Sequence, residues 1–153
     1  MSDQFMRAQS QLGAAERVLE YTDKLAAHWR SDEYIAASPM ERRQLLADHL
    51  TEHETLHNQQ SFYGLARQVI EAGDMCGTTA CAAGWDSLLR GQSYILPSAL
   101  TPGRFYLDGH IMDHARDSLG LDEAEAAVLF YQVTNAAAVR FLRTGSYAPA
   151  YNY

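Results

Sequence analysis

The chain has 153 residues, of which 47% are hydrophobic and 20% charged, so it is long enough for one domain with its own buried core. Its formal net charge of −7 argues against general binding to nucleic acids or anionic membranes, because both require a basic surface. No apolar run approaches the length of a membrane span, and the first residues lack the features of a secretion signal. We therefore expect one cytoplasmic domain over residues 1–153 that binds neither nucleic acid nor membrane.

The first half of the chain has the apolar spacing of two helices. From Phe5 to Trp29 apolar residues recur with helical spacing, which predicts a long amphipathic first helix. The next helix is predicted to begin at Ser38, because Ser38-Pro39-Met40-Glu41 combines a serine N-cap, a proline in the first turn and a glutamate three residues after the cap. Its leucines share one face with three histidines, His49, His53 and His57, so we expect these imidazoles to point inward.

Glycines and capping residues divide the rest of the chain. A helix over roughly residues 62–70 ends at Gly73, and Thr78 or Thr79 is expected to cap a short helix that stops at Gly91. An irregular connection with two prolines follows, and we expect no strand of weight there.

Two further helices are predicted after this connection. One spans roughly Asp108 to Leu119, and Asp122-Glu123-Ala124-Glu125 is a capping box for a last helix that runs to about Arg143. The sequence therefore predicts an all-α fold, a single compact bundle of five or six helices.

Residues 53–57 read His-Glu-Thr-Leu-His, the H-E-x-x-H pattern of zinc metalloproteases. On a continuous helix, His53 and His57 would present their imidazoles to one zinc ion, and Glu54 would act as the general base for a zinc-bound water. Two polar residues follow the motif where zincins usually have an apolar one, and the third ligand is undefined. A zinc-dependent hydrolase is therefore an alternative hypothesis.

His110 and His114 form a second pair of histidines four residues apart. If they faced His53 and His57, two helices could hold a structural zinc ion in a four-ligand cage. The other interpretation is that these are half-buried histidines that hydrogen-bond to carboxylates and hold no metal. We expect no cofactor, with zinc as the alternative.

The chain has two cysteines, Cys76 and Cys81. Two sulfurs cannot close a tetrahedral zinc site by themselves, and the spacing is not that of a zinc knuckle. A thiol at a helix N-terminus can have a lowered pKa and react, whereas most cytosolic cysteines pack as small buried side chains. We favour the interpretation that both cysteines pack as small side chains in the protein interior. The alternative is that they take part in redox chemistry or bind a metal.

The cysteines belong to a longer motif. The segment reads Cys76-Gly77-Thr78-Thr79-Ala80-Cys81-Ala82-Ala83-Gly84-Trp85, and Leu119-Gly120-Leu121 and Leu129-Phe130 follow it. This arrangement resembles the C-G-T-x-x-C-x-A-G-[W/H] … L-G-L … L-F pattern of small proteins found in actinobacteriophages and actinobacterial genomes, over roughly residues 62–143. The resembled proteins have no assigned activity, so the resemblance implies no catalytic residues. We interpret Cys76, Gly77, Thr78, Cys81, Gly84 and Trp85 as structural residues.

These observations favour a non-enzymatic, phage-type accessory protein that binds a protein partner or a second copy of itself. The tyrosines between Tyr147 and Tyr153 offer aromatic interface anchors for such a partner, although they could also pack on their own helices. The alternatives are a zinc-dependent hydrolase with the residues of the H-E-x-x-H motif and a helical protein with a structural zinc site.

Overall fold

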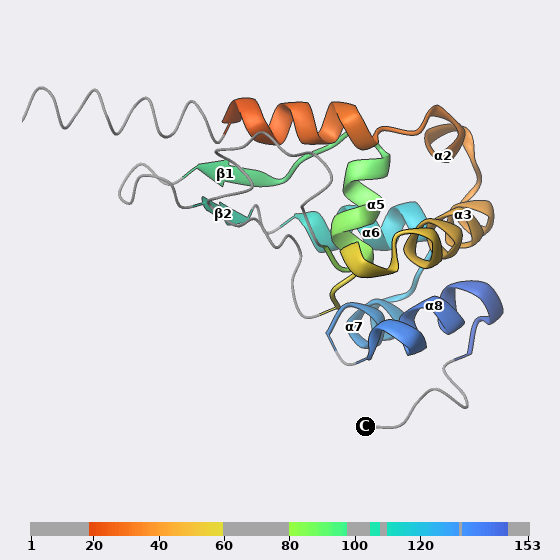
Figure 1. Ribbon diagram of the computed structural model, residues 1–153. Coiled ribbons are helices and arrows are strands. Elements are labelled where there is room, and N and C mark those ends of the chain that lie inside the picture. Colours follow the sequence, from red (N-terminus) through yellow and green to blue (C-terminus); the bar gives the residue numbers. More distant parts are fainter. Residues whose placement is uncertain (1–18, 60–79, 98–104, 108–109, 132, 147–153) are drawn as a thin grey trace, which may run out of the picture.

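A computed structural model describes residues 19–59, 80–97, 105–107, 110–131 and 133–146 (Figure 1). A helix over residues 19–29 comes first. The elements after it are α2 (Asp32–Ala36), α3 (Pro39–Glu52), the 3-10 turn η1 (Glu54–Leu56), α5 (Ala82–Leu89), β1 (Ile95–Pro97), β2 (Phe105–Leu107), α6 (Ile111–Leu119), α7 (Glu123–Tyr131) and α8 (Asn135–Thr144). The expected all-α fold is confirmed, and one small hairpin is added to it.

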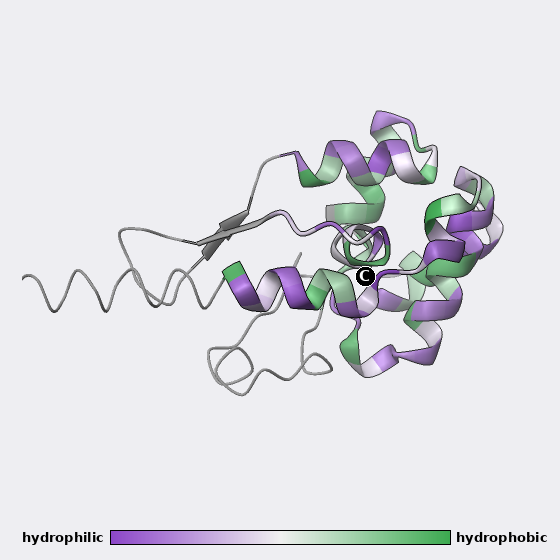
Figure 2. Ribbon diagram, turned by 90° about the horizontal axis from the view of Figure 1, so that it is seen from above, coloured by the Kyte–Doolittle hydropathy of each residue, from purple (hydrophilic) through white to green (hydrophobic). Residues whose placement is uncertain are grey.

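The centre of the bundle is α5, whose eight residues are all buried. It contacts α3, α6 and α7, and Figure 1 shows it surrounded by the other helices. In Figure 2 the outer helices carry both hydrophilic and hydrophobic residues. A helix that is buried on every side and mostly apolar, with Asp86 and Ser87 as its polar residues, is stable in such a central position. The short apolar segment after Cys81 therefore determines which helix lies in the middle.

Two predicted start signals form as expected. The Ser38 hydroxyl accepts a hydrogen bond from the Glu41 backbone N–H at 3.3 Å, and it donates to the Glu41 carboxylate at 3.0 Å. Asp122 and Glu125 exchange hydrogen bonds between side chain and backbone N–H at 2.7 and 3.1 Å. Such caps satisfy backbone groups that the first helical turn leaves unpaired.

The number of helices differs from the expected five or six. Seven α-helices lie within the described ranges, because α2 was not expected and the predicted last helix is two helices. Thr134 ends the connection after α7 and caps α8, since its hydroxyl accepts from the Ala137 N–H at 3.2 Å. The same kind of cap at Ser31, which accepts from the Tyr34 N–H, starts α2.

Two further expectations need correction. The helix expected to start at Thr78 or Thr79 begins at Ala82, after Cys81, which makes no side-chain cap bond; both threonines lie outside the described residues. The connection at Pro97 is not wholly irregular, because Pro97 pairs with Phe105 in an antiparallel β1–β2 hairpin.

The start of α3 is fastened to the end of α6. The Arg43 guanidinium donates to the carbonyls of Leu119 and Gly120 at 2.7 and 2.8 Å, so it satisfies acceptors that a helix end leaves free. Gly120 has φ 64°, and a Cβ placed on it would lie 3.0 Å from the Pro39 Cβ. Only glycine therefore allows this close approach without strain. No helix in the described part of the chain has the length and apolar character needed to cross a membrane.

Candidate functional site

The H-E-x-x-H residues do not lie on one helix. The α3 helix ends at Glu52, His53 is its C-cap, and the following residues form the turn η1. The chain leaves the helix because its backbone pairs with Ala80: the Ala80 N–H donates to the Leu56 carbonyl, and the Asn58 N–H donates to the Ala80 carbonyl, both at 2.9 Å. The expected alignment of His53 and His57 on one helical face is therefore wrong.

His57 is 6% exposed, and its Nε2 lies 2.8 Å from Gln59 Oε1. The Gln59 amide nitrogen donates to the Leu129 carbonyl at 2.7 Å, and its oxygen also accepts from the Ala82 N–H at 2.9 Å. This orientation makes Gln59 Oε1 an acceptor, so His57 Nε2 carries the proton and donates. Burial lowers the pKa of His57, and the hydrogen bond with Gln59 offsets part of that effect. The nitrogen that would bind zinc in a zincin is already engaged.

The segment around His57 connects several helices. The Trp85 indole N–H donates to the Leu56 carbonyl at 2.9 Å, which ties the segment to α5. The Asn135 side chain donates to the His57 carbonyl and accepts from the Gln59 N–H, both at 2.8 Å, which ties it to α8. In this fold the second half of the H-E-x-x-H motif serves as a buried structural connection.

His49 instead contacts both tryptophans of the chain, and His53 contacts Trp29. The ring centroids of His49 and His53 are 4.6 Å apart, and those of His49 and Trp85 are 4.4 Å apart. Trp29 places its ring 5.4 Å from His49, 5.2 Å from His53 and 4.8 Å from Trp85. We call these four residues the histidine–tryptophan cluster. It joins helix 19–29, α3 and α5.

His49 is held in this cluster as a neutral imidazole. Its Nε2 is buried and has no hydrogen-bond partner among the described residues. Burial, followed by the charges of His53 and His57, lowers the pKa of His49 to about 4. The imidazole therefore carries only one ring proton and no charge at neutral pH, and it packs in the cluster as an aromatic side chain.

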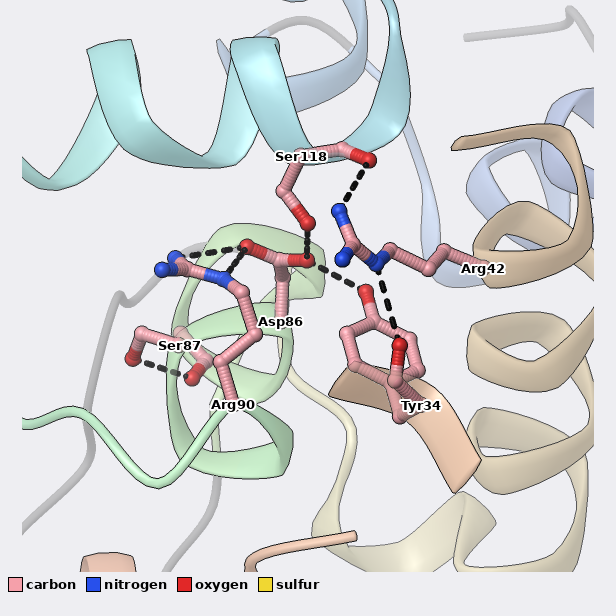
Figure 3. A network of polar contacts seen from close by, with 7 residues as sticks. Tyr34, Arg42, Asp86, Ser87, Arg90 and Ser118 are labelled. Atoms are coloured by element: carbon pink, nitrogen blue, oxygen red, sulfur yellow. Dashed lines mark hydrogen bonds and ion pairs between the residues drawn. The ribbon is translucent and has the colours of Figure 1, made fainter. Parts of the chain in front are cut away.

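A polar network that the sequence analysis did not identify surrounds Asp86 (Figure 3). Tyr34 and Ser118 donate from their hydroxyls to Asp86 Oδ1, the serine at 2.7 Å. Arg90 donates to Oδ2 from Nε at 2.9 Å, and its terminal Nη2 forms an ion pair with the same oxygen at 2.8 Å. Asp86 is fully buried; burial raises its pKa, and the Arg90 charge acts against that shift.

The Asp86 network joins three elements. Tyr34 comes from α2, Asp86 and Arg90 from the end of α5 and its cap, and Ser118 from α6. Three hydrogen bonds and one further ion-pair contact occupy the carboxylate, so its chemical role is to fix these elements relative to one another. The sequence contained a signal that could have indicated this network. Asp86 is the single acid in a mostly apolar segment, and a buried acid requires polar partners.

Three of the six motif residues lie in the described part of the chain. Cys81 is 2% exposed, and burial raises its pKa to about 11, so its thiol packs in protonated form. Gly84 and Trp85 are buried in α5. The structure favours packing over reactivity for Cys81, while Cys76, Gly77 and Thr78 lie outside the described residues.

The second histidine pair has other neighbours. His110 is exposed just before α6, with Nδ1 4.0 Å from an Asp113 carboxylate oxygen, and the His114 ring stacks on Tyr94 at 5.2 Å. The partners of His53 and His57 are Trp29 and Gln59. Within the described residues, no three histidines, cysteines, aspartates or glutamates are grouped so that they could hold a metal ion.

Comparison with known proteins gave no match to a protein-family model and no significant match to a curated protein or a solved structure.

Proposed function

We propose that this protein is a non-enzymatic, phage-type accessory protein that acts in the cytoplasm, the host's if it is phage-encoded, by binding a protein partner. The binding surface is the corner where α3 begins and α6 ends. Met40 is 61% exposed at this corner, and this observation carries the proposal, because a flexible, polarizable methionine side chain adapts readily to the surface of a partner.

Several exposed acidic side chains lie on the segments that meet at this corner. Pro39 packs on Gly120, so the first turn of α3 lies beside the connection from α6 to α7. The exposed acids of these segments are Glu41, Asp117, Asp122 and Glu123. Arg116 lies within 4 Å of three carboxylates of α6 and α7, and Arg42 and Arg43 reach the end of α6 from α3. These three positive charges balance only part of the negative charge of Glu41, Asp113, Asp117, Asp122 and Glu123. The matching partner has an apolar pocket with a basic rim.

The corner is also preorganised. Arg43 holds the end of α6 through two carbonyls, and Arg42 donates to the Ser118 carbonyl at 3.3 Å. A surface fixed in this way loses little conformational entropy when a partner binds.

A crosslinking experiment tests the binding surface. A photoreactive amino acid is placed at position 40 or, as the matched control, at position 19, where Leu19 is the other exposed large apolar residue in the described ranges. We expect position 40 to link one defined protein in the producing cells and position 19 to link none. The linked protein is then purified and titrated against the wild type and single alanine variants.

Met40→Ala should weaken binding at least about tenfold, the effect of truncating a central interface residue, whereas Leu19→Ala should leave the Kd unchanged. Added salt should weaken the complex, because exposed acids lie on the segments that form the corner. A linked species of twice the chain mass would identify a second copy as the partner. Equal linking from both positions, or an unchanged Kd with Met40→Ala, would refute the proposed surface.

A further inference from the structure

A closed ring of polar contacts includes Arg42, which lies two positions after Met40 (Figure 3). Tyr34 of α2 and Ser118 of α6 both donate from their hydroxyls to Asp86 Oδ1. The backbone carbonyls of the same two residues accept from the Arg42 guanidinium, at 3.0 Å from Nε and at 3.3 Å from Nη1. Asp86 therefore holds the hydroxyls and Arg42 the carbonyls of one pair of residues. We call these four residues the Arg42 ring.

Arg42 also reaches a third carbonyl. Its Nη2 donates to the Ile35 carbonyl at 2.7 Å, so two of its three acceptors belong to α2. Most carbonyls in the last turn of a helix lack a partner within that helix. A planar guanidinium can donate to several such acceptors in fixed directions, which the single ammonium of a lysine cannot do. The position of α2 against α3 therefore depends on an arginine at this site.

The Arg42 ring reaches both segments that form the binding corner. On one side, Arg42 lies in the first turns of α3, close in sequence to the exposed Met40. On the other side, Ser118 lies two positions before Gly120, which packs on Pro39. The ring thus connects the start of α3 and the end of α6 to α2 and to the central helix α5.

The Arg42 ring sets the position of these helices and is not what attaches them to the bundle. Leu46 of α3 and Leu119 of α6 are fully buried, so they hold both helices in the core whether or not the ring is closed. Apolar contacts have little directional preference, whereas a hydrogen bond requires its donor and acceptor to be aligned. Opening of the ring should therefore loosen the helix ends without unfolding the bundle.

We propose that Arg42 is a positioning residue for the binding corner, and that it couples partner binding at Met40 to α2 and to the Asp86 network. This inference rests on the binding surface proposed above. Coupling between two sites is reciprocal, so a closed ring strengthens partner binding and a bound partner stabilises the ring.

Hydrogen exchange of the full chain tests the Arg42 ring without a partner. Arg42→Lys keeps the charge but loses the planar fork, and Arg140→Lys is the matched control at an exposed position of α8. We expect Arg42→Lys to lower amide protection about tenfold both at Ile35 of α2 and at Leu121 after α6. Protection at Ala138 of α8 should stay as in the wild type, and Arg140→Lys should leave Ile35 and Leu121 unchanged.

Titration with the protein captured through position 40 tests the coupling. Arg42→Lys should raise the Kd by about fivefold or more, the usual size of a coupling between sites, and Arg140→Lys should leave it unchanged. In the wild type, saturation with the captured protein should raise amide protection at Ile35. This measurement needs no variant, so it decides the coupling if Arg42→Lys does not fold.

Three results would overturn the coupling. The first is a loss of protection in Arg42→Lys on one side of the ring alone, or on neither side. The second is an unchanged Kd in Arg42→Lys while Met40→Ala weakens binding, and the third is an unchanged Ile35 amide when the partner is bound. An unchanged Kd in Met40→Ala would instead show that the binding surface itself is wrong, and the coupling would fall with it.

Discussion

The hydroxyl of Tyr34 donates a hydrogen bond to the carboxylate of Asp86, 52 positions later in the sequence. Tyr34 is 1% exposed and Asp86 is 0% exposed, so the contact lies wholly within the protein. It ties α2 to the central helix at the point where Arg90 and Ser118 also reach the same carboxylate. A buried polar contact of this kind fixes one arrangement of helices, because any other arrangement leaves the acid without partners.

Removal of the Tyr34 hydroxyl should destabilise the protein. Tyr34→Phe keeps the ring but leaves the buried Asp86 with one donor fewer, which we expect to lower the free energy of unfolding by about 1–3 kcal/mol. Urea denaturation measures this change. Asp23→Asn, at an exposed acid of helix 19–29, should change stability by less than about 0.5 kcal/mol. A Tyr34→Phe protein as stable as the wild type would show that the hydrogen bond makes no net contribution.

Alanine at Gly120 should be more costly than alanine at Gly145. Both glycines end a helix with a left-handed φ, 64° and 75°. Strain from that conformation costs about 1 kcal/mol at either position. A Cβ at Gly120 would also meet Pro39 at 3.0 Å, whereas Gly145 has open space around it. Thermal or urea unfolding of the two variants should therefore rank Gly120→Ala as the less stable; the reverse order would contradict the close approach of α3 and α6.

The free energy of unfolding should fall in mild acid. Above pH 6.5, His49 is neutral in both the folded and unfolded states and adds no pH dependence. As the pH falls from 6.5 to about 4, the unfolded chain takes up the proton first, so stability decreases. The loss is about 1.4 kcal/mol per pH unit and about 3 kcal/mol in total. His57, whose pKa is also lowered, changes stability in the same direction.

Asp86 changes the free energy of unfolding with pH in the opposite direction to His49. Its pKa is raised in the folded protein, so the folded state takes up this proton first and gains stability as the pH falls toward the ordinary value of 3.8. Urea unfolding of the wild type and of His49→Phe at pH 7.5, 6 and 5 isolates the contribution of His49. His49→Phe should flatten the dependence between pH 6.5 and 5, and a wild-type curve that is already flat there would rule out the buried neutral histidine.

Metal removal should leave stability unchanged. Because His57 Nε2 donates to Gln59 and the motif does not form one helical face, we expect a chelator to shift the Tm by less than about 1 °C. Glu54 is exposed, so Glu54→Gln should have little effect on stability. If the chelator lowers the Tm, zinc restores it and His53→Ala removes the response, the zinc hypothesis is correct after all.

Cys81 should react slowly with thiol reagents in the folded protein. Its burial and its pKa of about 11 keep it inaccessible and protonated at neutral pH. The variant Cys76→Ser leaves Cys81 as the single thiol, so the colour released by a disulfide reagent reports on it alone. The reaction should take hours in buffer and seconds to minutes in urea. Complete labelling within minutes at pH 7.5 without denaturant would indicate a reactive thiol.

The sequence determined the features that depend on neighbours within a few positions. The caps at Ser38 and Asp122 bond to groups three residues away, so their residue types alone predict where α3 and α7 start. The end of α6 at Gly120 could likewise be predicted from the residue type, because the left-handed conformation at a helix end favours glycine. Apolar periodicity gave the all-α class, since one face of each outer helix must be buried.

Tertiary contacts decided the rest. The end of α3 depends on Ala80, which pairs with the segment around His57 from more than twenty positions away. Helical periodicity alone does not contain this pairing, so it wrongly predicted that His57 lies on the same helix as His49 and His53. Two of the partners of Asp86, Tyr34 and Ser118, lie 52 and 32 positions from it, and the spacing of residues along one helix does not specify which distant helix it will face. His49 is neutral and His57 a donor because of what packs around each ring, and that environment exists only once the chain has folded.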